Sequence, residues 1–160
     1  MGIVEGLRFE PLAEGDPDDY RPNSSLAVVV DPTGSGTPVR TLTLLFERMG
    51  PGDRIPLHAH EVDEVIVIDE GVGEVTLGQE RKRVGSGAVV FIPANTPHGT
   101  HNLGDSALRL HAIFPTETIT IRYIERNPAP GTEADPPQPP FSIDARELVE
   151  GDPSRAIRPL

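Results

Sequence analysis

The sequence contains no cysteine. Disulfide bonds are therefore excluded, and so is any metal site built from thiolates. Basic residues are also few, because 14 lysines and arginines stand against 25 aspartates and glutamates, giving a formal net charge of −11. A uniformly acidic chain does not attract nucleic acid or an anionic membrane surface, so neither is an expected partner. We expect this charge to serve solubility.

Long apolar runs are missing as well. No stretch approaches the roughly 18 apolar residues that a membrane-spanning helix needs. The N-terminal segment MGIVEGLRFEPLAEGD reaches acidic residues early and lacks the apolar run of a signal peptide. Residue 6 is glycine, so the start does not fit a myristoylation signal either. These absences predict a soluble, cytoplasmic protein without a membrane partner.

Glycine and proline are frequent, with 16 and 18 residues in a chain of 160, and long helical periodicities are scarce. This composition favours one all-β domain with many turns, a sandwich or a barrel. Residues 11–25 are acidic, contain proline and are predicted as a loop. Short apolar or alternating segments between turns are predicted as strands at 2–10, 26–31, 41–49, 63–71, 73–78, 88–93, 107–114 and 118–124.

The composition changes after Glu125, which predicts a barrel in residues 1–125 and a proline-rich arm and tail in 126–160. Residues 126–140 carry six prolines and cannot hold a strand ladder, so they are predicted as an extended arm or linker. One short helical turn is expected near 144–149. The tail is either disordered or docks on the barrel or on a second subunit; the candidate docking residues are Phe141, Ile143 and Leu148.

Two of the five histidines lie in the stretch HAHEVDE, which begins at residue 58. Side chains on a strand alternate, so His58, His60 and Glu64, all at even positions, would share one face with Ile66 and Ile68. Polar groups on an apolar inner face need a partner, because burying them unpaired costs a few kcal/mol each. A metal ion would satisfy all three together, whereas the plain alternative is a strand that happens to carry two histidines.

A third histidine, His98, follows an apolar strand that Gly87 and Pro93 bracket. An antiparallel barrel would bring His98 opposite the first two histidines. Three imidazoles and one carboxylate suit Fe, Mn, Ni, Cu, Co or Zn and suit Mg or Ca poorly. Such a site leaves coordination positions open, as a catalytic metal requires. Such a site would hold one divalent transition metal per chain, although the residues alone leave the plain alternative open.

These residues fall into a pattern that resembles the cupin superfamily. The first cupin motif, G-x5-H-x-H-x(3,4)-E-x6-G, is matched within residues 52–71, and the second, G-x5-P-x-G-x2-H-x3-N, within residues 87–102. Nine of the ten motif positions agree, and the exception is Asn95 in place of glycine. Asparagine tolerates the left-handed backbone conformation well, so the turn is expected to be kept.

The resemblance implies a double-stranded β-helix, the jelly-roll barrel of cupins, with one metal in its mouth. It also implies that the metal ligands are His58, His60, Glu64 and His98. All four positions hold the residue types usual in the family, so we expect the metal to be bound. The motifs cover the centre of the chain and say little about its first 25 residues or its tail.

Four further residues are candidates for contacts around the site. His111 would be a base behind the metal ligands or a substrate contact if its face of strand 107–114 points inward; otherwise it is a hydrogen-bonded structural histidine. Phe46 and the residues that share its face of strand 41–49 would line an apolar cavity together with Ile66, if the alternation holds. Asn102 shares a face with His98, but is expected to tie its turn together. An apolar cavity with a metal at one end fits a small organic ligand, and no cluster of basic residues near the motifs indicates phosphate.

The pattern predicts a metal-dependent enzyme that acts on a small organic molecule. The family resemblance points first to a dioxygenase of the quercetinase-like kind, with Glu64 as a general base. The alternatives are an isomerase or lyase, a non-catalytic binding or sensing protein, and a barrel that the metal only stabilises. Fold and metal do not fix the chemistry. A homodimer is expected from the usual assembly of small cupins.

Overall fold

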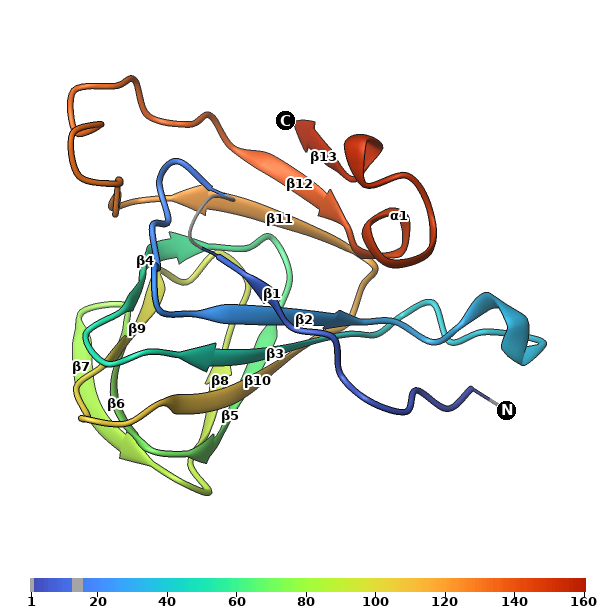
Figure 1. Cartoon of the computed structure of the whole chain (residues 1–160), viewed down its shortest axis with the longest axis horizontal. Helices are drawn as coiled ribbons and strands as arrows, with labels where there is room; N and C mark the ends of the chain where they lie inside the picture. Colours follow the sequence, from blue (N-terminus) through green and yellow to red (C-terminus); the bar gives the residue numbers. More distant parts are fainter. Residues whose placement is uncertain (1, 13–15) are drawn as a thin grey trace.

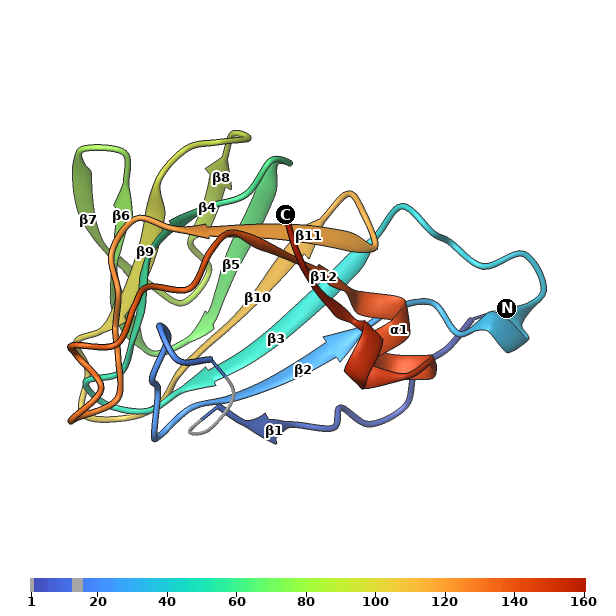
Figure 2. The ribbon, with the colours of Figure 1, turned by 90° about the horizontal axis from the view of Figure 1, so that it is seen from above.

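Two antiparallel β-sheets face each other and enclose a common core (Figures 1 and 2). The computed structural model describes residues 2–12 and 16–160. Met1 and residues 13–15 lie outside the described residues, and the latter belong to the predicted loop 11–25. The described residues form thirteen strands and one short α-helix, so the prediction of an all-β jelly-roll barrel is confirmed.

The first sheet has six strands in the spatial order β1-β2-β3-β10-β5-β8. They are β1 (Glu10–Pro11), β2 (Ser25–Val29), β3 (Thr43–Met49), β10 (Leu108–Phe114), β5 (Glu64–Glu70) and β8 (Val89–Ile92). The second sheet has seven strands in the order β13-β12-β11-β4-β9-β6-β7. They are β13 (Ile157–Pro159), β12 (Phe141–Asp144), β11 (Thr118–Tyr123), β4 (Arg54–Ala59), β9 (His98–Asn102), β6 (Val72–Leu77) and β7 (Glu80–Gly85).

The core lies between the sheets and follows from alternation along the strands. In β5, Glu64, Ile66 and Ile68 are buried, whereas the residues between them are half-buried. Each large apolar side chain buried in this way stabilises the fold by roughly 1.5–3 kcal/mol. The buried cluster consists of Met49, Ile66, Ile68, Ile92, Leu108, Leu110, Ala112, Phe114 and Ile119.

The predicted strands from residue 26 to residue 124 occur within one or two residues of their expected bounds. The prediction for residues 2–10 is wrong, because only Glu10 of that segment lies in a strand. Strands β4, β7, β12 and β13 were not predicted, and β9 was expected only as a strand that carries His98, without bounds. Strand β4 contains Pro56 at an irregularity in its pairing with β9, a position that a strand proline can occupy. Strand β7 begins with the charged run ERKR, which reads as a solvated segment.

The tail docks on the barrel. Strand β12 pairs with β11, and β13 pairs with β12, so the tail extends the seven-stranded sheet. The domain boundary at residue 125 stays a prediction. Phe141 and Ala145 are buried. The predicted helical turn is α1 (Ala145–Glu150), which the Asp144 side chain caps by accepting from the Glu147 N–H. Among the described residues, no helix is long and apolar enough to cross a membrane.

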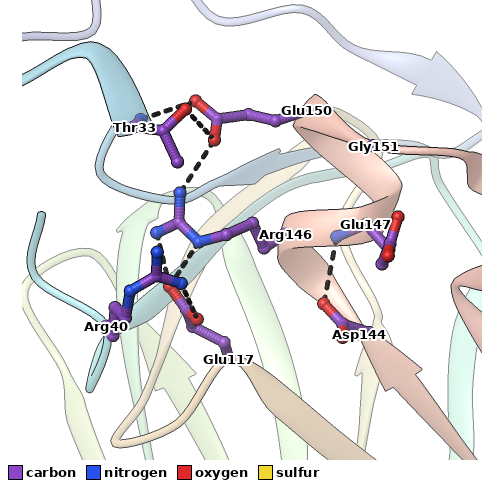
Figure 3. A pocket seen from close by; sticks show the side chains of 8 residues that line it. All are labelled: Thr33, Arg40, Glu117, Asp144, Arg146, Glu147, Glu150 and Gly151. Carbon is purple, nitrogen blue, oxygen red and sulfur yellow. Dashed lines mark hydrogen bonds and ion pairs between the residues drawn. The ribbon is translucent and has the colours of Figure 1, made fainter.

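Charged side chains line a pocket beside α1, and their interactions join the tail to the rest of the fold (Figure 3). Arg146 of α1 donates to Glu117, which lies just before β11, and its Nη1 lies 2.8 Å from Glu150 Oε2. Glu150 in turn accepts from the backbone N–H and hydroxyl of Thr33, each at 2.9 Å. The charged groups of this pocket therefore largely bind one another, which indicates a structural role for the pocket.

The proline-rich arm packs against the N-terminal loop instead of extending into solvent. Asp18 is fully buried and accepts from Arg126 Nε (2.5 Å) and from the backbone N–H of Gln138 (2.6 Å). The backbone N–H of Tyr20 donates to the carbonyl of Asn127 (2.7 Å). These bonds join two irregular segments into one cover over an end of the barrel, as the views in Figures 1 and 2 agree.

Candidate metal centre

Three histidines and one glutamate meet inside the barrel. His58 lies near the end of β4, His60 directly follows that strand, Glu64 opens β5 and His98 opens β9. His58 and His98 are direct partners in the pairing of β4 with β9. One potential ligand atom from each of the four residues lies within 4.8 Å of all the others, and all four residues are buried.

The common inward direction was predicted, but the route to it is different. Residues 58–64 are not one extended strand, because a bend at Glu61 and Val62 separates β4 from β5. The two strands belong to opposite sheets. The histidines therefore approach from the seven-stranded sheet and Glu64 from the six-stranded sheet, and the even spacing is only part of the reason why they meet.

Backbone carbonyls fix the orientation of the three imidazole rings. His58 Nδ1–H donates to the carbonyl of Pro56 (2.8 Å), and His60 Nδ1–H donates to the carbonyl of Thr120 (2.5 Å). His98 Nδ1–H donates to the carbonyl of Thr96 (2.9 Å). A carbonyl only accepts, so Nδ1 must hold the proton in each ring. With Nδ1 bonded to a carbonyl, each ring turns its Nε2 toward the centre of the group.

Two of these Nε2 atoms face each other without a proton between them. The Nε2 atoms of His58 and His60 are 3.1 Å apart, and neither has a proton to donate. Burial, together with the neighbouring His98 and His60, lowers the pKa of His58 well below its usual value. Burial likewise lowers the pKa of His60, although Glu64 opposes the shift. Protonation is thus a poor way to relieve the repulsion, whereas a cation at the centre would satisfy all three rings.

The carboxylate completes the same picture. Glu64 Oε2 lies 2.8 Å from His98 Nε2, yet neither atom has a hydrogen-bond partner within residues 2–12 and 16–160. Buried polar atoms without partners are uncommon and each needs an explanation. A bound divalent metal explains both, and the donor set of three nitrogens and one oxygen suits a transition metal. The residues present therefore fit the metal, whose identity they do not specify.

The four residues border a cavity of about 340 Å³ between the sheets. Its wall is mostly apolar and includes Ile66, as predicted, with Leu110 and Phe114 from β10. Phe114 also packs edge-on against the His60 ring, with 5.0 Å between ring centroids. The tail adds Phe141, Ile143, Leu148 and Ile157. An ion held here would face a small and largely apolar space.

Phe46 does not border the cavity, so that prediction is wrong, whereas His111 takes the second of its two alternatives, a hydrogen-bonded structural histidine. The two residues are direct partners on β3 and β10, with ring centroids 5.4 Å apart. They lie on the outer face of the six-stranded sheet, where His111 Nδ1 is 2.9 Å from Asp69 Oδ2. Alternation identified which residues share a face but not which face is inward. On β3 the inward residues are the odd-numbered ones, such as Leu45 and Glu47.

Asn102 ties its turn together, as expected. Its side-chain nitrogen donates to the carbonyls of Met49 and Ser106, each at 2.9 Å, and its oxygen accepts from the Gly104 N–H. It does not border the cavity. Asn95, the one departure from the cupin motifs, has φ 62°, so it adopts the left-handed conformation that was expected of it.

Sequence reasoning missed a second polar group on the cavity wall. It comprises Asp16, Asp19, Arg21, Glu47, Tyr123 and Gln138. Tyr123 pairs with His58 across β11 and β4, and its hydroxyl donates to Asp16 Oδ2 (2.6 Å). Burial raises the pKa of Tyr123, and it raises the pKa of Asp19 to about 6. No sequence signal marks this group, because its members come from the N-terminal loop, β3, β11 and the arm.

Comparisons with known proteins agree with this geometry. The family model described as "Cupin domain" matches residues 45–114, which include all four residues of the metal centre. An uncharacterised protein of Methanocaldococcus jannaschii is 37% identical over 60 residues, which is 37% of this chain and 48% of that protein. The chain thus matches only about half the length of this curated relative.

Two solved structures share the fold. The polyketide cyclase RemF from Streptomyces resistomycificus has a TM-score of 0.65 at 23% identity, covering 86% of this chain and 94% of its own. Salicylate 1,2-dioxygenase from Pseudoaminobacter salicylatoxidans has a TM-score of 0.53 at 22% identity, covering 64% of this chain and 29% of its own. From the two motifs, the paired sheets and the family match, the chain contains a cupin domain.

Proposed function

We propose that this protein is a mononuclear metal-dependent enzyme that acts on a small, largely apolar organic molecule. The observation that carries the proposal is the shared position of two features. Unpartnered ligand atoms of Glu64 and His98 lie at the wall of a mostly apolar cavity between the two sheets. A purely structural ion would not need an adjoining cavity of this kind. A small organic substrate needs both an apolar space and a polar anchor.

The chain's own residues would hold the metal, orient its ligands and exclude water from the site. A divalent metal bound by His58, His60, Glu64 and His98 supplies Lewis acidity and, if it is redox-active, chemistry with dioxygen. The carbonyls behind each imidazole keep the rings aimed, as outer partners of metal-binding histidines generally do. The apolar wall would exclude water from the reacting groups. Glu64 is the candidate general base, because its carboxylate adjoins the cavity and can accept a proton from a substrate held there.

The first candidate reaction is a dioxygenase reaction of the quercetinase-like kind. Support comes from the ligand set and from the shared fold with a salicylate dioxygenase, which was also solved with gentisate. The second candidate is a reaction without redox change, such as an isomerisation, a lyase reaction or a cyclisation. It is favoured by the RemF cyclase, whose fold matches more of this chain than the dioxygenase fold does. A non-catalytic binding protein is the third candidate.

The test begins with the metal. We would measure the metal content of protein purified without chelators, beside a His58→Ala, His98→Ala double variant. About one transition-metal ion per chain, lost in the variant, supports the proposal. Oxygen uptake with aromatic substrates only in Fe-, Mn-, Ni- or Cu-loaded protein would identify the dioxygenase. Turnover retained with Zn²⁺ would identify the reaction without redox change. If neither protein takes up metal, even from an excess of it, the proposal of a metal-dependent enzyme is refuted.

We further propose a homodimer formed through the outer face of the six-stranded sheet. Val65 and Ile113 lie side by side there and continue to Phe91 of β8, which is 72% exposed, while Val89 is 51% exposed. Val65 and Ile113 are half-buried, and an apolar row that ends in large exposed side chains is typical of an interface. Analytical ultracentrifugation should give a dimer for the wild type and a monomer for Phe91→Glu. The control Leu103→Glu, at an exposed site on another part of the fold, should stay dimeric.

A further inference from the structure

The cavity has a second polar end, built around one arginine. Arg21 is only 5% exposed. Its Nη1 donates to Glu47 Oε2 (2.6 Å) and its Nη2 donates to Asp19 Oδ2 (2.7 Å). Asp19 is itself 7% exposed. These residues border the same cavity as the metal centre, and apolar side chains occupy most of the wall between the two polar ends.

Three buried atoms at this end have no hydrogen-bond partner in the part of the chain that the structure describes. They are Arg21 Nε, Asp19 Oδ1 and Gln138 Oε1. One is a donor and two are acceptors. A buried ion-pair cluster that served only to fasten the loop would be expected to use these positions too, because each unsatisfied buried group costs about 1–3 kcal/mol. Their presence on a cavity wall is the arrangement of a binding site.

The charges at this end select against an anion. Arg21 contributes one positive charge, while Asp19, Glu47 and Asp16 contribute three carboxyl groups around the same part of the cavity. Both terminal nitrogens of Arg21 are already engaged. A ligand carboxylate would therefore approach carboxylates in a low-dielectric space, where like charges repel strongly. A hydroxyl group suits the atoms better, because its oxygen accepts from Arg21 Nε and its proton goes to Asp19 Oδ1 or Gln138 Oε1.

We propose that Arg21, Asp19 and Gln138 form a second binding subsite, which receives a hydroxyl group at the uncharged end of a ligand whose other end lies at the metal centre. This inference rests on the proposed function, since it takes the cavity to be a ligand site. It narrows the ligand to a largely apolar molecule with polar groups at both ends. It also gives the N-terminal loop and the proline-rich arm a role in recognition, since they supply all three residues.

The test uses three naphthalene probes that differ only at the end away from the metal. Each carries a carboxylate that the metal can bind; the far substituent is a hydroxyl in 6-hydroxy-2-naphthoate, a methoxy group in 6-methoxy-2-naphthoate and a second carboxylate in 2,6-naphthalenedicarboxylate. The full chain would be loaded with Zn²⁺ and titrated. Because the chain has no tryptophan, the fluorescence of a bound probe can be followed directly.

We expect the hydroxyl probe to bind about tenfold or more tightly than the methoxy probe, the effect of one buried hydrogen bond to a charged group. The dicarboxylate should bind more weakly than either. Asp19→Asn keeps an oxygen for Arg21 but can present an N–H to the cavity, so the advantage of the hydroxyl over the methoxy probe should vanish. The control Asp105→Asn, in an exposed loop, should keep it.

Equal binding of the hydroxyl and methoxy probes to the wild type would overturn the subsite and leave the proposed function standing. Binding of none of the three probes to the Zn²⁺-loaded protein would overturn both. If Asp19→Asn does not fold, as judged by its circular dichroism and melting, Gln138→Leu makes the same test from the half-buried arm. It should lower the preference for the hydroxyl probe by about threefold or more; an unchanged preference in that variant would count against Gln138 as a member of the subsite.

Discussion

Replacing Glu64 by glutamine should stabilise the metal-free protein and destabilise the metal-loaded one relative to the wild type. Without metal, the carboxylate oxygen of Glu64 lies 2.8 Å from His98 Nε2, and neither atom has a partner among the described residues. The glutamine amide can donate a hydrogen to that bare nitrogen. It also removes a buried negative charge, since Glu64 is only 5% exposed.

The size of the effect follows from these two atoms. Leaving a buried polar atom unsatisfied costs about 1–3 kcal/mol, so the amide should stabilise the metal-free protein by about that amount. For a chain of this length the gain corresponds to a rise of roughly 2–12 °C in melting temperature. With Zn²⁺ at about 100 times its dissociation constant, the wild type gains about 2.7 kcal/mol from binding, and the variant, which has lost the anionic ligand, gains far less.

The assay is thermal unfolding followed by circular dichroism, with EDTA and with Zn²⁺. The order of the two melting temperatures should reverse between the two conditions. Glu61→Gln, three residues away and exposed, should change neither melting temperature by much. A metal-free Glu64→Gln protein that melts below the metal-free wild type would refute the reasoning, because the carboxylate would then have partners that the structure does not show.

Three further predictions concern the surroundings of the site. Asn102→Ala should lower the free energy of unfolding by about 1–3 kcal/mol, since it leaves the buried carbonyl of Met49 unpaired and also removes the partly buried bonds to Ser106 and Gly104. The metal content by mass spectrometry should stay the same. Gly99→Ala would place a methyl group 2.8 Å from the Ile55 carbonyl and push β4 from β9, so Co²⁺ titrations followed by absorbance should show weaker binding, whereas Gly85→Ala, whose nearest contact is 3.8 Å, should behave as the wild type. Because the pKa of Asp19 is raised to about 6 on folding, the folded protein binds the proton of this carboxyl group more tightly than the unfolded chain does. Urea unfolding should therefore show a contribution to the free energy of unfolding of roughly 3 kcal/mol that is present below pH 3.8 and lost by about pH 6. Asp19→Asn should remove this dependence of stability on pH.

The candidate metal centre could be predicted from the sequence because its residues form a local pattern. The spacing of His58, His60 and Glu64, with His98 after a proline-containing turn, depends on strands that the sequence also predicts. Even so, the argument from one continuous strand was wrong in detail, since the chain changes sheets between His60 and Glu64. The constraint that survives is that an inward side chain on either sheet points into the same core.

The rest of the cavity was not accessible, for two physical reasons. Alternation gives relative faces only, so it could not show that Phe46 and His111 lie on the face opposite to Ile66. Contacts between distant segments leave no local pattern. The hydrogen bond of Tyr123 with Asp16 joins residues 107 positions apart, and prolines in the arm suggested a linker where the structure has a cover.

The four candidate metal ligands and much of the cavity wall belong to different parts of the chain. His58, His60, Glu64 and His98 all lie within residues 45–114, the span that the family shares. Arg21, Gln138, Phe141 and Leu148, by contrast, reach the cavity from outside that span. Mutations in the two ends of the chain can therefore change the shape of the cavity while the four candidate metal ligands stay unchanged. Grafting these ends onto another cupin domain would be a direct route to exchanging ligand preference without rebuilding the metal site.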